Sequence, residues 1–136
     1  MASNLIVLDA SIFIGHLRTG CHQERIDSLS GLIRTSSVVL AELLRGATRS
    51  AESAFLKALK KNHPLLTPTE KNWIESGHIL ERIRADLGCS PGKLRDLHFD
   101  VLIALTARTH GARLITSNRS DFELIRTYRN FHLDVW

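Results

Sequence analysis

The stretch LIVLDASIFI (residues 5–14) places one carboxylate, Asp9, between two apolar runs. Residues 5–8 form a continuous aliphatic run of the length typical of a strand buried on both faces. Residues 11–17 continue as a predicted helix, with Gly20 near its end. Because an unpaired buried carboxylate is costly, we expect Asp9 to cap a helix, to pair with a cation or to bind a metal.

Short apolar runs alternate with helical segments along the rest of the chain, which predicts an α/β fold with a mostly parallel sheet. In such sheets ligands bind at the carboxyl ends of the strands, which is where Asp9 lies. In the first half we expect a β-like stretch from Thr35 that becomes helical around Leu40 and ends near Gly46, a helix over 50–61 and an extended piece over 63–66. In the second half we expect a helix that begins at a capping box over 67–70, followed by a loop over 90–93. The next helix should start at Asp100 and stop at Gly111. A strand over 112–117, a helix over 120–126 and a strand over 131–136 should complete the chain.

The composition narrows the class of protein. A chain of 136 residues predicts a single domain over 1–136, and the net charge of +4 permits an anionic partner without requiring one. No run approaches the ~20 apolar residues that span a bilayer, and the N-terminus lacks the pattern of a signal peptide, so we expect no membrane association. Cys21 and Cys89 stand far apart in no metal-binding pattern, as reduced thiols of a cytoplasmic protein would.

Three further acids occur in apolar surroundings at or near predicted strand-to-helix junctions: Glu42, Asp100 and Asp121. Together with Asp9 they are placed to converge at one rim of the sheet. Converging carboxylates repel one another unless a cation neutralises them. Mg²⁺ and Mn²⁺ prefer oxygen ligands and support phosphodiester hydrolysis.

Each acid also has a purely structural explanation. Asp9 can cap the following helix, Glu42 can pair with Arg45 one turn on, and Asp100 can be an N-cap or a first-turn residue. Asp121 belongs to a possible capping box over 120–123. Capping explains Glu42 least well, because this residue lies in the middle of an apolar helix.

Three blocks of the sequence, LIVLDASIFI, VVLAELLRG (38–46) and HFDVLIALTARTHGARLITSNRSDF (98–122), resemble the PIN-domain family and specifically its VapC-type toxins. The segment over 50–90 carries little that is diagnostic. The resemblance implies a three-layer α/β/α sandwich with a mostly parallel central sheet. It also implies an endoribonuclease that depends on Mg²⁺ or Mn²⁺, acts on RNA as the toxin of a toxin–antitoxin pair, forms a homodimer and is blocked by a small antitoxin protein.

The same resemblance assigns residues. Asp9, Glu42 and Asp100 fall on the family's three main acidic positions, as catalytic residues and metal ligands. The family's fourth acidic position holds an amide here, Asn118, and Asp121 is the nearby acid that would supplement it at the metal. The hydroxyl residues that the family places near the site fall on two further positions, for which helix capping and turn bonding are an equal alternative: Ser11 and Thr116.

Other residues are weaker candidates. Asp96 lies four residues before Asp100, so a continuous helix would make it an accessory ligand, although a salt bridge is the more common role. Arg45, Arg49 and Lys57 would follow an RNA backbone or simply form the solvated face of a helix. Two tryptophans, Trp73 and Trp136, are interpreted as core or subunit-contact residues. The sequence contains no zinc motif and no glycine-rich nucleotide-binding loop.

Three other functions compete with a toxin. A haloacid-dehalogenase-like phosphotransferase would use Asp9 as nucleophile, but it needs a second acid two residues later, where this chain has Ser11. A PIN-like module that binds RNA or protein without catalysis would lack the acids, and the three main positions are intact. A PIN nuclease of RNA processing, or one that cleaves DNA, is compatible with the same motif.

Overall fold

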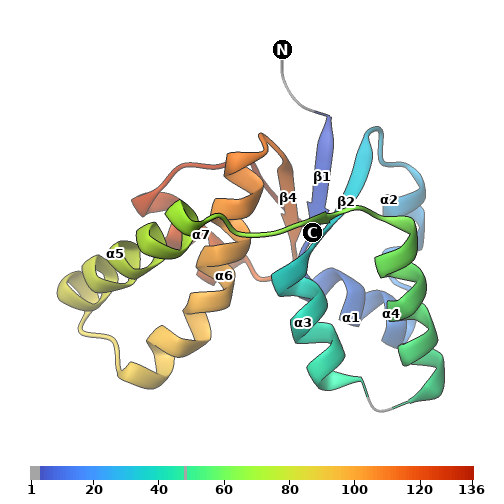
Figure 1. The fold of residues 1–136 in the computed structure, drawn as a ribbon, viewed down its shortest axis with the longest axis horizontal. Helices are drawn as coiled ribbons and strands as arrows, with labels where there is room; N and C mark the ends of the chain where they lie inside the picture. Colours follow the sequence, from blue (N-terminus) through green and yellow to red (C-terminus); the bar gives the residue numbers. More distant parts are fainter. Residues whose placement is uncertain (1–3, 48) are drawn as a thin grey trace.

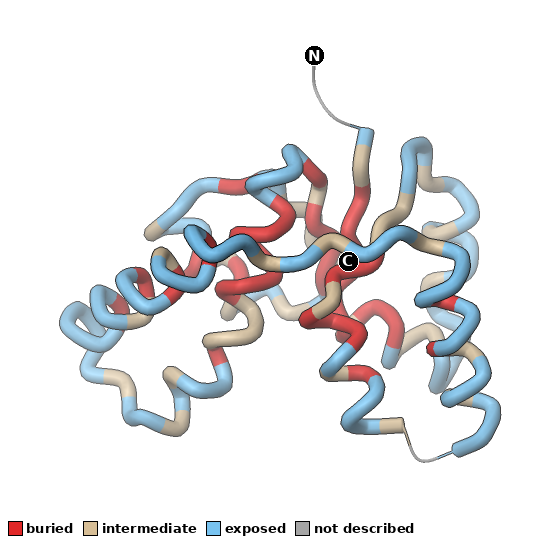
Figure 2. The backbone as a smooth tube through the Cα atoms, viewed as in Figure 1, coloured by how far each residue is buried: buried red, intermediate tan, exposed pale blue. Residues whose placement is uncertain are grey.

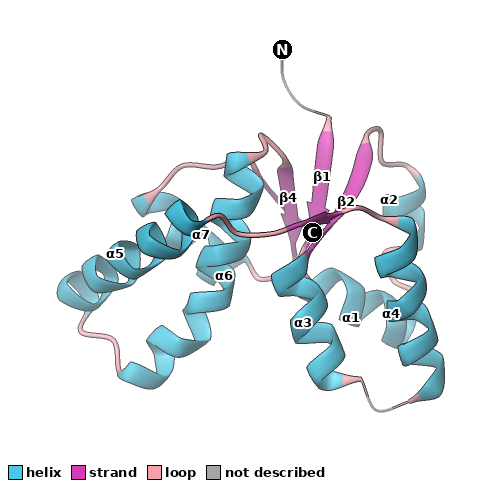
Figure 3. Ribbon diagram, in the orientation of Figure 1, coloured by secondary structure: helices cyan, strands magenta, loops and turns pink. Residues whose placement is uncertain are grey.

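The structure is a computed structural model that describes residues 4–47 and 49–136. Its centre is a five-stranded sheet in the order β3-β2-β1-β4-β5, in which every pair of neighbouring strands is parallel. Figure 3 shows this sheet between two groups of helices. The strands are β1 (Leu5–Leu8), β2 (Leu32–Ser36), β3 (Leu65–Leu66), β4 (Arg113–Thr116) and β5 (Leu133–Val135).

Seven described helices cover the two faces of the sheet. In Figure 1 the first four lie on one side and the last three on the other, which confirms the three-layer α/β/α architecture. No described helix is both long and apolar enough to cross a membrane. The helices are α1 (Ala10–Thr19), α2 (Gln23–Asp27), α3 (Ser37–Gly46), α4 (Ser50–Asn62), α5 (Glu70–Leu87), α6 (Pro91–Thr109) and α7 (Arg119–Tyr128).

The direction of the chain across the sheet reverses between β1 and β4. From β1 the chain moves outward through β2 to β3, and it then crosses to β4 and continues to β5 on the other side. Right-handed crossovers in opposite directions place their helices on opposite faces. The carboxyl ends of β1 and β4 therefore border the position at which α/β proteins form their ligand sites.

The core lies between the sheet and the helices, as the continuous buried segments in Figure 2 show. Val7 on β1 and Leu114 and Ile115 on β4 are completely buried. Helix α6 is buried from Val101 to Ala107, which makes it the most enclosed helix of the fold. Burial of each such large aliphatic side chain contributes about 1.5–3 kcal/mol, so the strands that carry the rim are held firmly.

The boundary between β2 and α3 lies earlier than the sequence predicted. The strand ends at Ser36 and the helix begins at the next residue, whereas the β-branched pair Val38–Val39 suggested strand until about Leu40. The Ser36 hydroxyl accepts hydrogen bonds from the backbone N–H groups of Val38 and Val39 and starts the helix. Capping outweighed the modest β preference of valine.

Helix α6 also begins earlier than predicted, at Pro91 instead of Asp100. The expected loop over 90–93 is wrong, because Ser90 is the N-cap and proline is favourable at the first helical position. Asp100 consequently lies in the middle of a 19-residue helix. Its alternative role as an N-cap is therefore wrong.

Two other predicted caps are shifted. Helix α5 is capped by Thr69, which forms a capping box with Asn72, and not by the predicted box at 67–70. Helix α7 is capped by Asn118 and not by a box starting at Ser120. The structure also contains the short helix α2, which was not predicted from the sequence. Trp73 is 50% exposed, so its interpretation as a core residue is wrong, while that as a subunit contact stays a prediction.

Candidate active site

Asp9 lies at the carboxyl end of β1, and its backbone N–H donates to the carbonyl oxygen of Ile115 at 2.9 Å. This bond continues the pairing of β1 with β4 by one residue. The residue is only 4% exposed. Its Oδ2 atom accepts hydrogen bonds from Ser11 Oγ at 2.7 Å and from Thr116 Oγ1 at 2.9 Å, and Asp9 is also the N-cap of α1.

The two hydroxyls that hold Asp9 are themselves held by the backbone of the neighbouring strand end. The N–H of Ser117 donates to Ser11 Oγ at 3.0 Å, and the N–H of Asn118 donates to Thr116 Oγ1 at 2.9 Å. Each hydroxyl can therefore direct its own proton to the carboxylate. Within the described part of the chain Oδ1 of Asp9 receives no hydrogen bond, so one oxygen is available to a ligand.

Glu42 lies on α3 and faces the same rim. Its Oε1 atom is buried and has no hydrogen-bond partner among the described residues. Burial, reinforced by the charge of Asp9, raises the pKa of Glu42 to about 7, and the charge of Arg45 offsets this only in part. The alternative ion pair with Arg45 does not occur among the described salt bridges, and the guanidinium lies instead over the ring of Phe99, 5.7 Å from its centroid.

Asp100 faces the rim from the middle of α6, which packs against α3. Burial raises the pKa of Asp100 to about 8, and the negative charges of Asp9, Glu42 and Asp121 act in the same direction. Only the charge of Lys93 lowers it. This coupling shows that the four acids predicted from the sequence share one electrostatic environment, although they come from four different elements.

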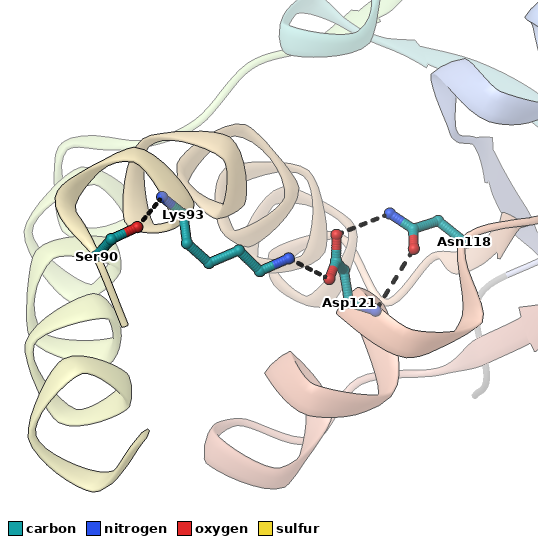
Figure 4. A network of polar contacts seen from close by, with 4 residues as sticks. All are labelled: Ser90, Lys93, Asn118 and Asp121. Carbon is teal, nitrogen blue, oxygen red and sulfur yellow. Dashed lines mark hydrogen bonds and ion pairs between the residues drawn. The ribbon is translucent and has the colours of Figure 1, made fainter. Parts of the chain in front are cut away.

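Asp121 differs from the other three acids because donors engage both of its carboxylate oxygens (Figure 4). Lys93 Nζ donates to Oδ1 at 3.0 Å, and Asn118 Nδ2 donates to Oδ2 at 3.1 Å. Asn118 in turn accepts the N–H of Asp121 on its Oδ1 at 3.5 Å, as the cap of α7. The hydrogen bond to Asp121 raises the pKa of Lys93, so its ammonium stays charged.

Lys93 was not among the candidates from the sequence. It precedes Asp121 by 28 residues, and no motif connects the two positions. The only available signal was its spacing from the other α6 residues: seven residues before Asp100, about two turns, it lies on the same side of the helix. That signal is hidden when residues 90–93 are interpreted as a loop.

A cleft of about 490 Å³ between α3 and α6 opens beside Glu42. Arg45 and Arg95 line it together with Asp96 and the rings of His98 and Phe99. Asp96 is exposed and forms no ion pair within 4.0 Å in the described structure, so the expected salt bridge is absent.

The predicted RNA-binding residues separate in space. Arg45 lies beside the acids, as a lining residue of the cleft next to Glu42. Arg49 instead lies 3.8 Å from Glu52 and lines a different pocket, with Leu17 and Gly46. Lys57 is an exposed residue of α4. Only Arg45 is therefore placed next to the proposed chemistry.

The donor set suits a hard divalent cation. Asp9 offers a free oxygen, Glu42 has a buried oxygen without a partner, and the repulsion that raises the pKa of Asp100 would be relieved by positive charge. The described residues nevertheless contain no preformed group of three metal-ligating side chains, so the carboxylates must rotate inward to share one ion. Such rotation is open to Glu42 and Asp100, because both side chains are only partly buried.

Comparisons with known proteins agree with this fold. The sequence model of a family described as PIN domain matches residues 6–128. A chain of VapBC2 from Rickettsia felis, crystallised with a DNA fragment of its promoter, superimposes with a TM-score of 0.72 at 21% identity and covers 97% of this chain and 98% of its own. A chain of DNA-bound VapBC from Salmonella typhimurium superimposes with a TM-score of 0.73 at 22% identity. The match covers 100% of this chain and 99% of the other.

A toxin–antitoxin complex from Klebsiella pneumoniae gives a TM-score of 0.61 at 20% identity and covers 86% of this chain and 89% of its own. No curated protein sequence matches the chain significantly. Structural likeness at these identities establishes the fold, and the family match rests on the sequence itself.

Proposed function

The chain belongs to the PIN-domain family, and on this premise we propose that it is a divalent-metal-dependent endoribonuclease, the VapC-type toxin of a toxin–antitoxin pair. One observation carries the proposal. The carboxyls of Asp9, Glu42 and Asp100 influence one another's charge at the rim between β1 and β4, and no described Lys, Arg or His forms an ion pair with them within 4.0 Å. A rim that brings acids together without a directly paired cation in this way is suited to a divalent cation and, through it, to a phosphate.

Asp9, Glu42 and Asp100 would hold Mg²⁺ or Mn²⁺, with Asn118 and Asp121 beside them. A bound cation of this kind activates water and offsets the charge that develops on phosphate. Ser11 and Thr116 keep Asp9 in one orientation by donating to its Oδ2. Oδ1 receives no hydrogen bond from the described residues, and fixing the carboxylate in this way reduces the reorganisation needed on binding.

The substrate would enter through the cleft between α3 and α6. Arg45 and Arg95 can neutralise phosphates of a single strand, and Phe99 and His98 provide aromatic faces for bases. Because the cleft includes Glu42, a strand that follows it would pass the acids directly.

The decisive experiment is digestion of single-stranded RNA by the parent, Asp9→Asn and Asp100→Asn with excess Mg²⁺ or with EDTA. We expect cleavage by the parent alone, and only with metal. Asp27→Asn, a change of an exposed acid on α2, is the matched control and should cleave like the parent. Full activity of both site variants at saturating Mg²⁺ would disprove the assignment.

A second candidate is a PIN-like module that binds without catalysis. The grouping of mutually repelling acids argues against it, because a surface that only binds RNA or protein has no need of such a group. Titration with Mn²⁺ distinguishes the two: absence of both binding and thermal stabilisation would favour the module. Single-stranded DNA in the same digest separates a deoxyribonuclease from a ribonuclease.

We further propose that a small antitoxin docks over a partly apolar cleft of about 140 Å³ beside the site. Ile14 and Leu17 of α1, both exposed, face Leu56 of α4 there, and Glu42 lies at its edge. The similar structures include toxin–antitoxin complexes. Co-purification with the product of a short neighbouring reading frame should be lost in Ile14→Asp and kept in Ile74→Asp, which changes an exposed residue of α5.

We also propose a homodimer that acts on RNA in the cytoplasm. Light scattering of the purified protein should give twice the mass of one chain. A monomer at micromolar concentration would contradict the dimer without affecting the proposed chemistry.

A further inference from the structure

The acids of the rim fall into two groups. Asp9, Glu42 and Asp100 have no cationic contact within 4.0 Å among the described residues, whereas Asp121 has Lys93 at 3.0 Å. Asn118, which also borders Asp121, is neutral and donates its amide hydrogen to the same carboxylate. On one side of the rim the described acids have no directly paired cation, and on the other side Asp121 already has one.

Nucleases that use two metal ions hold them roughly 3.5–4 Å apart, so that one lies near the attacking oxygen and the other near the leaving oxygen. A second ion in this chain would need the oxygens of Asp121 or Asn118. Both oxygens of Asp121 accept hydrogen bonds from nitrogen donors, and Asn118 Oδ1 caps α7. The oxygens that a second ion would need therefore already accept hydrogen bonds, and one of these bonds comes from a cation.

We propose that the Lys93 ammonium takes the place of a second divalent cation, so that the chain binds one metal ion at Asp9, Glu42 and Asp100 and none at Asp121. This inference rests on the proposed metal-dependent function and specifies its metal site. With Lys93 and Asp121 paired, the ionised rim carries three negative charges. A single divalent cation would leave the rim with one net negative charge, whereas a second divalent cation would make its net charge positive.

The position of Lys93 is built into the fold. Its backbone N–H donates to Ser90 Oγ at 3.2 Å, which fixes the first turn of α6 (Figure 4). The side chain then reaches across to α7, where Asp121 is only 22% exposed. Asp96 on α6 is the other acid whose charge acts on Lys93, and Lys93 itself is the cation that acts on Asp100.

Counting bound Mn²⁺ tests the inference without using activity. Calorimetric titration and electron paramagnetic resonance of free Mn²⁺ should give one ion per chain for the parent. Lys93→Met should bind a second Mn²⁺ ion more weakly, through the Asp121 carboxylate that has lost its lysine. The double variant Lys93→Met, Asp121→Asn should again bind one ion per chain. Lys93→Arg, which keeps the charge, and Lys60→Met, which removes an exposed lysine of α4, should both bind one ion.

Circular dichroism should show that every variant is folded, because Lys93 is 44% exposed and its loss leaves no cavity. Two ions in the parent, one ion in Lys93→Met, or loss of an ion in Asp121→Asn would each overturn the inference while leaving metal binding intact. Absence of any bound Mn²⁺ in the parent would instead overturn the proposed function, and the inference with it.

Discussion

Asp9 shows how one carboxylate combines two roles that the sequence presented as alternatives. It caps α1, and it also faces Glu42 and Asp100 across the rim. The roles are compatible because the cap and the hydroxyls of Ser11 and Thr116 all use Oδ2. Capping by itself is therefore weak evidence against a catalytic acid.

Thr116→Val tests the support of Asp9. It removes a hydroxyl that donates to a buried carboxylate at 2.9 Å, and loss of such a bond costs about 1.5–3 kcal/mol. We expect lower stability in urea and slower RNA cleavage. Thr106→Val, which loses only a bond to a carbonyl within α6, should cleave at the parental rate. Parental activity of Thr116→Val would contradict the role.

The pH dependence of the metal-free protein follows from two carboxyls. The pKa of Glu42, about 7, and that of Asp100, about 8, exceed their ordinary values of 4.5 and 3.8. The folded state therefore binds more protons than the unfolded state between these values, and stability falls as pH rises from about 4 to 8. In EDTA, we expect a Tm lower at pH 8 than at pH 5 by an amount on the order of a few °C.

Asp100→Asn should flatten this dependence and raise the Tm at pH 8, while Asp27→Asn should keep the parental slope. Mg²⁺ should stabilise the parent more at pH 8 than at pH 5, because metal binding competes with protons. A Tm in EDTA that is constant or rises toward pH 8 would show that the two carboxyls are not coupled as described.

At the level of elements, the ends of helices decide where the acids lie. Ser36 starts α3 early enough for Glu42 to reach the rim, and Ser90 starts α6 early enough for both Lys93 and Asp100 to belong to it.

The connection before β2 is also constrained, by the backbone conformation of one glycine. Gly31 has φ 144°, and a Cβ there would collide with the carbonyl oxygen of Asn4.

Gly31→Ala and Gly77→Ala form a matched pair that tests this constraint. The first should destabilise the protein, because the backbone next to β1 must move. Gly77 lies in the interior of α5, where an added Cβ would meet only open space, so its replacement should stabilise by roughly 0.5–1 kcal/mol. Chemical denaturation measures both, and equal midpoints would show that the loop adapts freely.

At the level of the whole molecule, the reversal of strand order between β1 and β4 brings the acids together. Asp9 and Thr116 end adjacent strands, while Glu42 and Asp100 arrive on helices from opposite faces of the sheet. The net charge of +4 is spread over a surface with many arginines and lysines. The cleft beside Glu42 is where part of this positive charge meets the rim.

Arg45→Ala should weaken binding of single-stranded RNA, measured with Ca²⁺ in place of Mg²⁺ to suppress cleavage, and should lower its dependence on salt. Each lost phosphate contact reduces the salt slope by about 0.7 for single strands. Lys57→Ala removes an equal charge from the exposed face of α4 and should change binding less. Equal losses in the two variants would indicate that only overall charge matters.

The sequence predicted the fold class because strand and helix patterns are local properties of the chain. It also singled out Asp9, Glu42 and Asp100, because acids in apolar runs are visible without any structure. Several of its errors concern helix boundaries, at Ser37, Pro91 and Glu70, where a cap or a proline outweighed the local pattern. The missed helix α2 and the exposed Trp73 are further errors, which depend on how the elements pack.

The sequence by itself therefore determined the layered α/β architecture and the set of acids that the rim contains. Only the tertiary structure decided which acids lack a cation and which one has it. That distinction depends on Lys93 reaching Asp121 across two packed helices. Such a pairing follows from the way α6 packs on α7, a contact between segments 28 residues apart, and no local pattern encodes it.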